Sequence, residues 1–277
     1  MTVINAIILG LVQGIAEFLP ISSSGHLAIL NNLFGMTTTE NGHMFFDVLL
    51  HLGTLISICI VYWQDIVDMF YEVLAFANLG PRAGERQERY PAARLFFMIV
   101  LATLPLFLIL PINDMLEGLY YNNVFIGLTL ILTGAMLYVS DKMKPGRKNE
   151  NSMTVWDALI IGLCQCVATI PGLSRSGTTI TAGIATGLRR EFAVKFSFLM
   201  SLPAVLGANI LSLVDAAREG IDMQYVPAYL IGMAVAMVSG IGAISLLKYI
   251  SKNSKFGGFA YYCWVAGALT IVLSMIF

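Results

Sequence analysis

The sequence predicts an all-α integral membrane protein with six transmembrane helices and two re-entrant helical hairpins in an inverted-topology repeat, forming one polytopic domain over residues 1–277. Three observations support this fold class. Hydrophobic residues make up 57% of the chain and charged residues only 12%, which is too little polar surface for a soluble protein. The cations collect in a few loops, and one polar segment occurs twice. The net charge of −1 gives no indication of a nucleic-acid partner, and membrane lipids are the expected surroundings.

The apolar runs define the expected crossings. Six segments come close to the ~20 apolar residues that span a hydrocarbon core. They are predicted at about 44–63, 94–112, 123–140, 193–214, 226–248 and 258–277. After the first of these, residues 64–80 alternate acidic and apolar side chains at helical spacing, which predicts a helix lying in the membrane interface.

A polar segment runs from Gln13 to His26 and returns from Gln165 to Thr178 without a gap. Each copy predicts an apolar helix, residues 3–19 or 154–170, that ends at a proline before a Ser/Gly turn and a short second helix. This form is typical of a re-entrant hairpin, because unwound backbone persists in a membrane only where protein or a cavity surrounds it. The residues repeated 152 positions later include Gly10, Leu11, Gln13, Ala16, Ser22, Ser24 and Gly25.

The positive charges predict the topology. Of the 16 lysines and arginines, 14 lie within residues 64–94, 141–153, 189–195 and 248–257. The positive-inside rule places these segments in the cytoplasm, and it holds for all of them only if neither hairpin crosses the membrane. Three crossings then separate the hairpins, which enter from opposite sides with their tips meeting near the bilayer centre. The repeats are predicted at about 1–140 and 153–277, with both termini outside.

The first hairpin carries candidate catalytic residues. Gln13 and Glu17 are four residues apart and share one helix face. A carboxylate inside a membrane is costly, which favours a functional role for Glu17. The turn that follows offers hydroxyl and backbone N–H groups at a helix start, an arrangement that binds anions, although the same residue types are typical of helix caps. These turn residues are Ser22, Ser23, Ser24, Gly25 and His26.

The second tip adds a positive charge at Arg175, whose guanidinium is suited to paired hydrogen bonds with phosphate oxygens. Its polar neighbours are Ser174, Ser176, Gly177 and Thr179. A base, a candidate nucleophile and a cationic clamp that face one another predict phosphoryl chemistry on a lipid. The candidates for these roles are Glu17, Ser23, His26 and Arg175. A purely structural ion pair between Glu17 and Arg175 is the alternative interpretation.

The other two histidines are interpreted as structural or supporting residues. Asp47 and His51 stand one helical turn apart, so an acid and an imidazole there are expected to satisfy each other. His43 lies near the outer end of the first predicted span.

Two motifs identify a resemblance. The chain resembles the undecaprenyl pyrophosphate phosphatase family, also known as bacitracin-resistance proteins, through (E/Q)-x-x-x-E at Gln13–Glu17 and P-G-x-S-R-S-G-x-T at Pro171–Thr179. The resemblance covers essentially the whole chain. It implies a multi-pass enzyme of the bacterial plasma membrane that hydrolyses undecaprenyl diphosphate to undecaprenyl phosphate and inorganic phosphate. The active site is expected to face the extracytoplasmic side, where the reaction recycles the lipid carrier for cell-wall synthesis and gives bacitracin resistance.

The resemblance also implies roles for individual residues. Ser23 is the expected nucleophile, with Glu17 and His26 as its acid and base partners, while His26 or a water molecule remain alternative attackers. Arg175 is the expected phosphate clamp. The residues expected to assist in holding phosphate are Gln13, Ser22, Ser24, Gly25, Ser174, Ser176, Gly177 and Thr179.

The sequence leaves open both a metal ion and an oligomer. Gln13 stands where some family members carry Glu, which puts in doubt a scheme that needs two carboxylates, including one with a carboxylate-bound Mg²⁺ or Ca²⁺. The requirement for a divalent cation therefore stays open, as does a homodimer.

Two other functions are weighed against this one. A phosphatidic-acid type phosphatase shares a Ser-Gly-His element, but its Lys-x6-Arg-Pro and Ser-Arg-x5-His motifs are absent, since Thr181 is the residue at the histidine position. A transporter is the second alternative, because inverted repeats with broken helices are typical of transporters. Release of phosphate from a lipid diphosphate distinguishes hydrolysis from transport alone.

Overall fold

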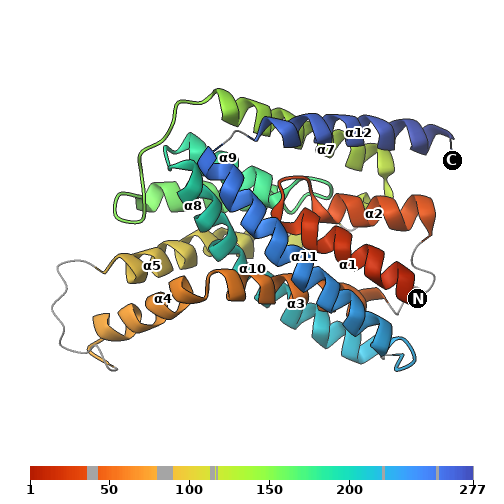
Figure 1. Cartoon of the computed structure of the whole chain (residues 1–277), viewed down its shortest axis with the longest axis horizontal. Coiled ribbons are helices and arrows are strands. Elements are labelled where there is room, and N and C mark those ends of the chain that lie inside the picture. The colour runs from red at the N-terminus through yellow and green to blue at the C-terminus, as the bar shows by residue number, and fades with distance from the viewer. Residues whose placement is uncertain are drawn as a thin grey trace.

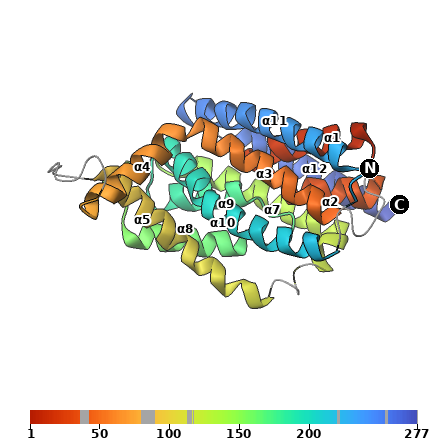
Figure 2. The same cartoon turned by 90° about the horizontal axis from the view of Figure 1, so that it is seen from below.

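A computed structural model describes residues 1–35, 43–79, 90–112, 116, 118–219, 222–253 and 256–276. Within these residues the chain is helical and contains no strand (Figures 1 and 2). The α-helices are α1 Val3–Phe18, α2 Ser23–Phe34, α3 His43–Val61, α4 Trp63–Phe76, α5 Pro91–Thr103, α7 Asn123–Lys142, α8 Val155–Val167, α9 Arg175–Ala185, α10 Arg190–Glu219, α11 Val226–Asn253 and α12 Gly257–Ile276.

Long apolar helices dominate this architecture. Among the described residues, five helical segments are long and apolar enough to cross a membrane, and a sixth results if α3 and α4, bent by 75° to each other, form one span. The predicted all-α fold with several apolar spans is confirmed at this level. The predicted hairpin arms 3–19 and 154–170 correspond to α1 and α8, which are apolar but shorter. α4 occupies most of the segment predicted as an interfacial helix, residues 64–80.

The predicted span 94–112 differs from the structure in its second half. α5 ends at Thr103, and two short 3₁₀ helices follow, η1 Leu104–Leu108 and η2 Leu110–Ile112. Each of them contains a proline, Pro105 or Pro111. Proline lacks the N–H that continues an α-helical ladder, and its ring disturbs the preceding turn. The regular α-helix therefore stops well before residue 112.

The helices pack in long pairs that hold the hairpins in place, with α1 parallel to α11 and α7 antiparallel to α12. α1 lies along α11, and α7 lies along α12, while α3 packs against both α10 and α11 (Figures 1 and 2). At the end of α1, the buried ring of Phe18 meets Phe198 of α10 edge to face, with 5.4 Å between ring centroids. Tyr62, at the α3–α4 bend, contacts the same Phe198 ring. These contacts hold the end of α1 against the first half of α10.

Close approach of α1 and α11 depends on glycine. A Cβ atom added at Gly10 would lie 2.4 Å from the carbonyl oxygen of Gly232 on α11. We expect Gly10→Ala to lower the free energy of unfolding by ~1–3 kcal/mol, because backbone must shift to admit the methyl group. Gly242→Ala on α11 is the matched control, since a Cβ there meets no atom within 4 Å. Equal thermal-unfolding midpoints for the two variants in detergent would contradict this close packing.

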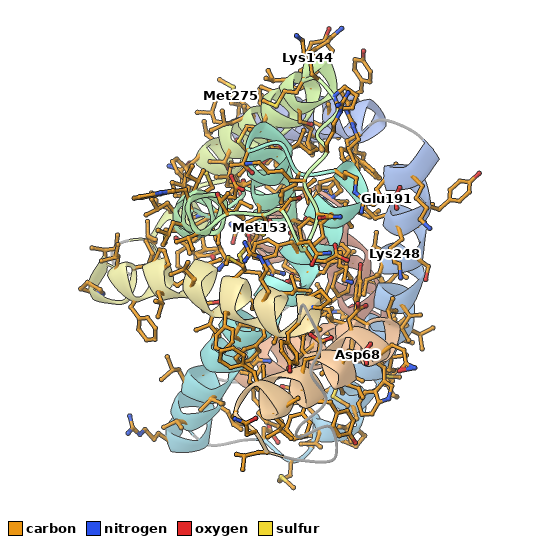
Figure 3. The ribbon with its side chains drawn as sticks, turned by 90° about the vertical axis from the view of Figure 1, so that its left-hand side faces the viewer. Asp68, Lys144, Met153, Glu191, Lys248 and Met275 are labelled. Carbon is orange, nitrogen blue, oxygen red and sulfur yellow. The ribbon has the colours of Figure 1, made fainter. Side chains whose placement is uncertain are left out.

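One end of the bundle joins segments that the sequence predicts to be cytoplasmic. Arg94 donates to the carbonyl oxygen of Met153 at 2.6 Å, and Arg190 pairs with Asp141 at 2.7 Å. Figure 3 looks onto this end, whereas both chain termini lie at the opposite end in Figure 1. Residues 80–89, which belong to the predicted segment 64–94, and residues 254–255 lie outside the described residues.

Candidate active site

The second helix of each hairpin begins with the same cap. Ser22 is the N-cap of α2, and its Oγ accepts a hydrogen bond from the backbone N–H of Gly25 at 3.1 Å. Ser174 is the N-cap of α9, and its Oγ accepts from the N–H of Gly177, also at 3.1 Å. The two glycine N–H groups expected to bind phosphate are therefore engaged in capping in this structure. The caps fix the direction of the residues that follow them.

The turns of the two hairpins contact each other. Ser176, in the first turn of α9, donates a hydrogen bond from its Oγ to the carbonyl oxygen of Leu19 at 3.2 Å. A Cβ atom added at Gly25 would lie 3.1 Å from the Cα of Gly172, so the two backbones touch. Residues about 150 positions apart in the chain thus face one another across the junction, as the repeat of the polar segment predicts.

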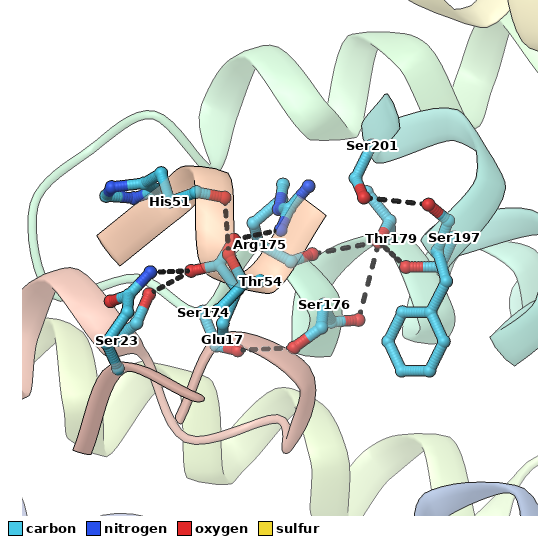
Figure 4. A network of polar contacts seen from close by, with 12 residues as sticks. Glu17, Ser23, His51, Thr54, Ser174, Arg175, Ser176, Thr179, Ser197 and Ser201 are labelled. Carbon is cyan, nitrogen blue, oxygen red and sulfur yellow. Dashed lines mark hydrogen bonds and ion pairs between the residues drawn. The ribbon is translucent and has the colours of Figure 1, made fainter. Parts of the chain in front are cut away.

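Glu17 is the centre of a polar network at this junction (Figure 4). Its side chain is only 7% exposed. One carboxylate oxygen, Oε2, accepts hydrogen bonds from Ser23 Oγ at 2.6 Å and from Gln13 Nε2 at 3.2 Å. The other oxygen, Oε1, pairs with the Nη2 group of Arg175. The structure therefore brings together Glu17, Ser23 and Arg175, three of the four residues predicted to be catalytic.

Thr179 supports the second tip from behind. Its hydroxyl lies 2.6 Å from the hydroxyl of Ser197 on α10 and donates to the Arg175 carbonyl oxygen at 2.9 Å. Thr133 of α7 accepts the backbone N–H of Ser174 at 3.1 Å. Thr179 and Gln13 do not line the cavity described next. In this structure they hold the residues that do.

A cavity of about 1100 Å³ opens beside the network. Its polar wall holds most of the predicted phosphate-binding hydroxyls, and its other wall comes from η1 and the C-terminal half of α10. The polar lining residues are Glu17, Ser22, Ser23, Ser24, Asp47, His51, Thr103, Tyr120, Gln165, Thr169, Ser174, Arg175, Ser176, Asn209 and Ser212. The apolar ones include Leu106, Phe107, Ile109, Leu116, Val205, Ala208 and Ile210. Such a combination suits a ligand with a charged head and a hydrocarbon tail.

The histidines lie differently from the sequence interpretation. His26 does not line the cavity: its Nδ1 bonds the Ser22 carbonyl oxygen and its Nε2 bonds the Tyr262 hydroxyl, both at 2.7 Å. Asp47 and His51, interpreted as structural or supporting residues, line the cavity. His51 Nδ1 lies 2.9 Å from the backbone oxygen of Asp47. Because that oxygen can only accept, Nδ1 carries a proton and leaves Nε2 free of this bond. The side chain of His43 lies outside the described residues.

The surroundings of Glu17 do not fit a divalent cation. No group of three or more His, Cys, Asp or Glu suited to a metal is found among the residues that the structure describes. Both oxygens of Glu17 already accept hydrogen bonds, one of them from a guanidinium that would repel a cation. The side chain next to Glu17 on α1 is the amide of Gln13 and not a second carboxylate. We therefore derive no step through a metal ion.

Comparison with known proteins agrees with the motifs. A family model described as bacitracin resistance protein BacA matches residues 6–269. The chain is 38% identical to an undecaprenyl-diphosphatase of Methanosphaera stadtmanae, covering 99% of each chain. It is 40% identical to an undecaprenyl-diphosphatase of Pelotomaculum thermopropionicum, covering 99% of this chain and 97% of that one. A third relative, the undecaprenyl-diphosphatase of Alkaliphilus metalliredigens, is 38% identical over the full length of both. With its two signature motifs meeting at one cavity, this chain belongs to the bacitracin resistance protein BacA family.

Proposed function

We propose that the protein hydrolyses undecaprenyl diphosphate to undecaprenyl phosphate and inorganic phosphate. The observation that carries this proposal is the chain of contacts from Ser23 through Glu17 to Arg175 at the polar wall of the cavity. A hydroxyl bonded to a carboxylate beside a guanidinium supplies a nucleophile, a base and an electrostatic clamp. The family and its undecaprenyl-diphosphatase members support the choice of substrate.

The reaction uses two displacements. Ser23 Oγ gives its proton to Glu17 and attacks the terminal phosphorus, and the bond from phosphorus to the bridging oxygen breaks as undecaprenyl phosphate leaves. Glu17 passes this proton to the departing undecaprenyl phosphate and, as a carboxylate again, deprotonates a water molecule that attacks the phosphoserine. Inorganic phosphate leaves as Glu17 returns the proton to Ser23 Oγ. Arg175 neutralises the charge that develops on the phosphoryl oxygens. Because Arg175 pairs with Glu17 before substrate binds, a phosphate that draws the guanidinium away leaves the carboxylate free to accept the serine proton.

The apolar wall of the cavity fits the prenyl chain. Leu106 and Phe107 of η1 line it together with Val205 and Ala208 of α10. Large apolar side chains farther along α10 are exposed, with Ile210 at 55%, as expected for a surface that meets lipid. A prenyl tail can therefore extend from the cavity into the bilayer while its diphosphate reaches Ser23.

We also propose an inverted-topology repeat with two re-entrant hairpins and an active site on the extracytoplasmic side of the plasma membrane. The hairpins α1–α2 and α8–α9 have matching caps, and their packing corresponds, with α1 against α11 and α8 against α5. The segments rich in Lys and Arg contact one another at one end of the bundle. Both features favour the topology that the positive-inside rule predicts.

Cysteine labelling tests this topology. We expect Arg147→Cys in intact cells to react with a membrane-impermeant maleimide only after permeabilisation, because residues 141–153 are assigned to the cytoplasm. Met223→Cys is the matched outer position, since Met223 is 75% exposed in the loop before α11, and it should react from outside. The unmodified chain measures the background from the four native cysteines. Labelling of position 147 from outside would contradict the inverted repeat.

Phosphate release by purified protein tests the proposed function. In detergent, the protein should release inorganic phosphate from undecaprenyl diphosphate, whereas Glu17→Gln should not, because an amide cannot accept the Ser23 proton. A protein that only transports the lipid would release no phosphate in either form. That result would overturn the proposal.

A further inference from the structure

Gln165 carries a buried polar group that the network around Glu17 does not use. The side chain lies on α8, is 2% exposed and lines the cavity. Neither its Nε2 nor its Oε1 has a hydrogen-bond partner. Buried amides are almost always hydrogen-bonded, because an unpaired polar atom costs stability. A free amide at the wall of a cavity is therefore suited to a ligand that enters that cavity.

The repeat explains why this amide is free. Gln165 corresponds to Gln13, 152 positions earlier, and Gln13 donates a hydrogen bond from its Nε2 to the carboxylate of Glu17. The residue that corresponds to Glu17 is Thr169, which has no carboxylate and whose hydroxyl donates to a backbone oxygen at 2.7 Å. The second hairpin thus keeps the donor but lacks the anion. An anionic oxygen of a ligand can take its place.

A second unpaired donor lines the same cavity. Arg175 uses Nη2 to bind Glu17, whereas its Nη1 is buried and has no partner. The helix α8 packs against η1, whose Leu106 and Phe107 belong to the apolar wall assigned to the prenyl chain. Gln165 therefore belongs to the wall next to the lipid tail, while Ser23 comes from the other hairpin.

We infer that Gln165 Nε2, with Nη1 of Arg175, binds the phosphate that stays attached to the prenyl chain, so that the cavity distinguishes a lipid diphosphate from a lone phosphate group. This assignment rests on the proposed function. In it, the terminal phosphate lies at Ser23 and the lipid-linked phosphate lies at Gln165. The amide holds the leaving group while the bridging bond breaks.

Gln165→Met tests the inference, because methionine has a similar size and no donor. We expect binding of a prenyl methylenediphosphonate, measured by calorimetry in detergent, to weaken about tenfold or more, the scale of one hydrogen bond to a charged group. Inhibition of turnover by prenyl monophosphate should weaken similarly, and inhibition by inorganic phosphate should not change. Without ligand, the unfolding midpoint should stay equal or rise, since two unpaired buried atoms are removed.

Thr178→Val is the matched control, since the Thr178 hydroxyl is also buried and unpaired but Thr178 does not line the cavity. This variant should bind the diphosphonate as tightly as the unmodified protein. Gln165→Glu keeps the shape and volume, and should bind the diphosphonate at least as weakly as Gln165→Met. Unchanged affinity with a lower unfolding midpoint in Gln165→Met would make Gln165 a structural residue. Weaker inhibition by inorganic phosphate alone would move Gln165 to the terminal phosphate and overturn the assignment. Failure of the proposed function is distinct, because the unmodified protein would then release no phosphate from undecaprenyl diphosphate, whether or not it binds the diphosphonate.

Discussion

Arg175→Lys should lower kcat/KM for undecaprenyl diphosphate by about 10²-fold or more, the scale for losing one preorganised charged donor at a developing phosphoryl charge. The variant keeps a positive charge, but an ammonium group cannot reproduce the fork of the guanidinium. In the structure the two ends of that fork differ, because Nη2 bonds Glu17, whereas Nη1 is buried and has no hydrogen-bond partner. The measurement is initial phosphate release over a range of lipid concentrations.

Arg190→Lys is the matched control for this substitution. Arg190 is also an arginine in a largely buried ion pair, with Asp141, at the end of the bundle assigned to the cytoplasm. Its replacement should cost some stability and leave kcat/KM close to that of the unmodified protein. If Arg175→Lys and Arg190→Lys behave alike, Arg175 is a structural partner of Glu17 and the role as phosphate clamp is wrong.

The hairpins could be predicted because the signals that form them are local. Pro20 follows the end of α1, and the cap of α2 by Ser22 involves residues only three positions apart. The repeat added long-range information. Because Ser22 matches Ser174, the same kind of turn and helix start could be predicted at both positions. Contact between the two turns followed from the charge bias of the loops. Sequence reasoning therefore found the part of the polar wall that the two turns supply, and it missed the polar residues that other segments contribute, such as Asp47, His51 and Asn209.

The direction of the histidine rings could not be predicted in this way. His26 follows the cap at a position that suits a catalytic role, but its ring reaches the hydroxyl of Tyr262, 236 positions away on α12. The stacking of the two rings, with centroids 5.7 Å apart, is a product of tertiary packing. His51 appeared to be satisfied by Asp47, yet both residues line the cavity. The nearby prolines similarly ended α5 earlier than hydropathy alone predicts.

Ser23→Ala should abolish turnover while substrate binding stays largely intact. Ser23 Oγ donates a hydrogen bond to Glu17 Oε2 at 2.6 Å. Removing this hydroxyl takes away the proposed nucleophile and leaves Arg175 in place. The remaining donors, including the Arg175 guanidinium, still hold the diphosphate. Phosphate release measures turnover, and calorimetry with a prenyl methylenediphosphonate measures binding. Substantial residual turnover in Ser23→Ala would remove the serine from the mechanism.

Quenching the reaction with lipid that carries a radiolabelled terminal phosphate then separates the three attackers. Attack by Ser23 gives an acid-stable, base-labile phosphoserine, which Ser23→Ala cannot form. Ser24→Ala is the control and should still form it, because the Ser24 hydroxyl lies 3.5 Å from Ser22 Oγ and is not the group bonded to Glu17. Attack by His26 gives an acid-labile, base-stable adduct, which the structure disfavours because both ring nitrogens are engaged outside the cavity. Direct attack by water labels no residue. Since only the first case joins the nucleophile directly to Glu17, His26→Ala should retain the phosphoserine, and an acid-labile phosphoenzyme in the unmodified protein would exclude Ser23.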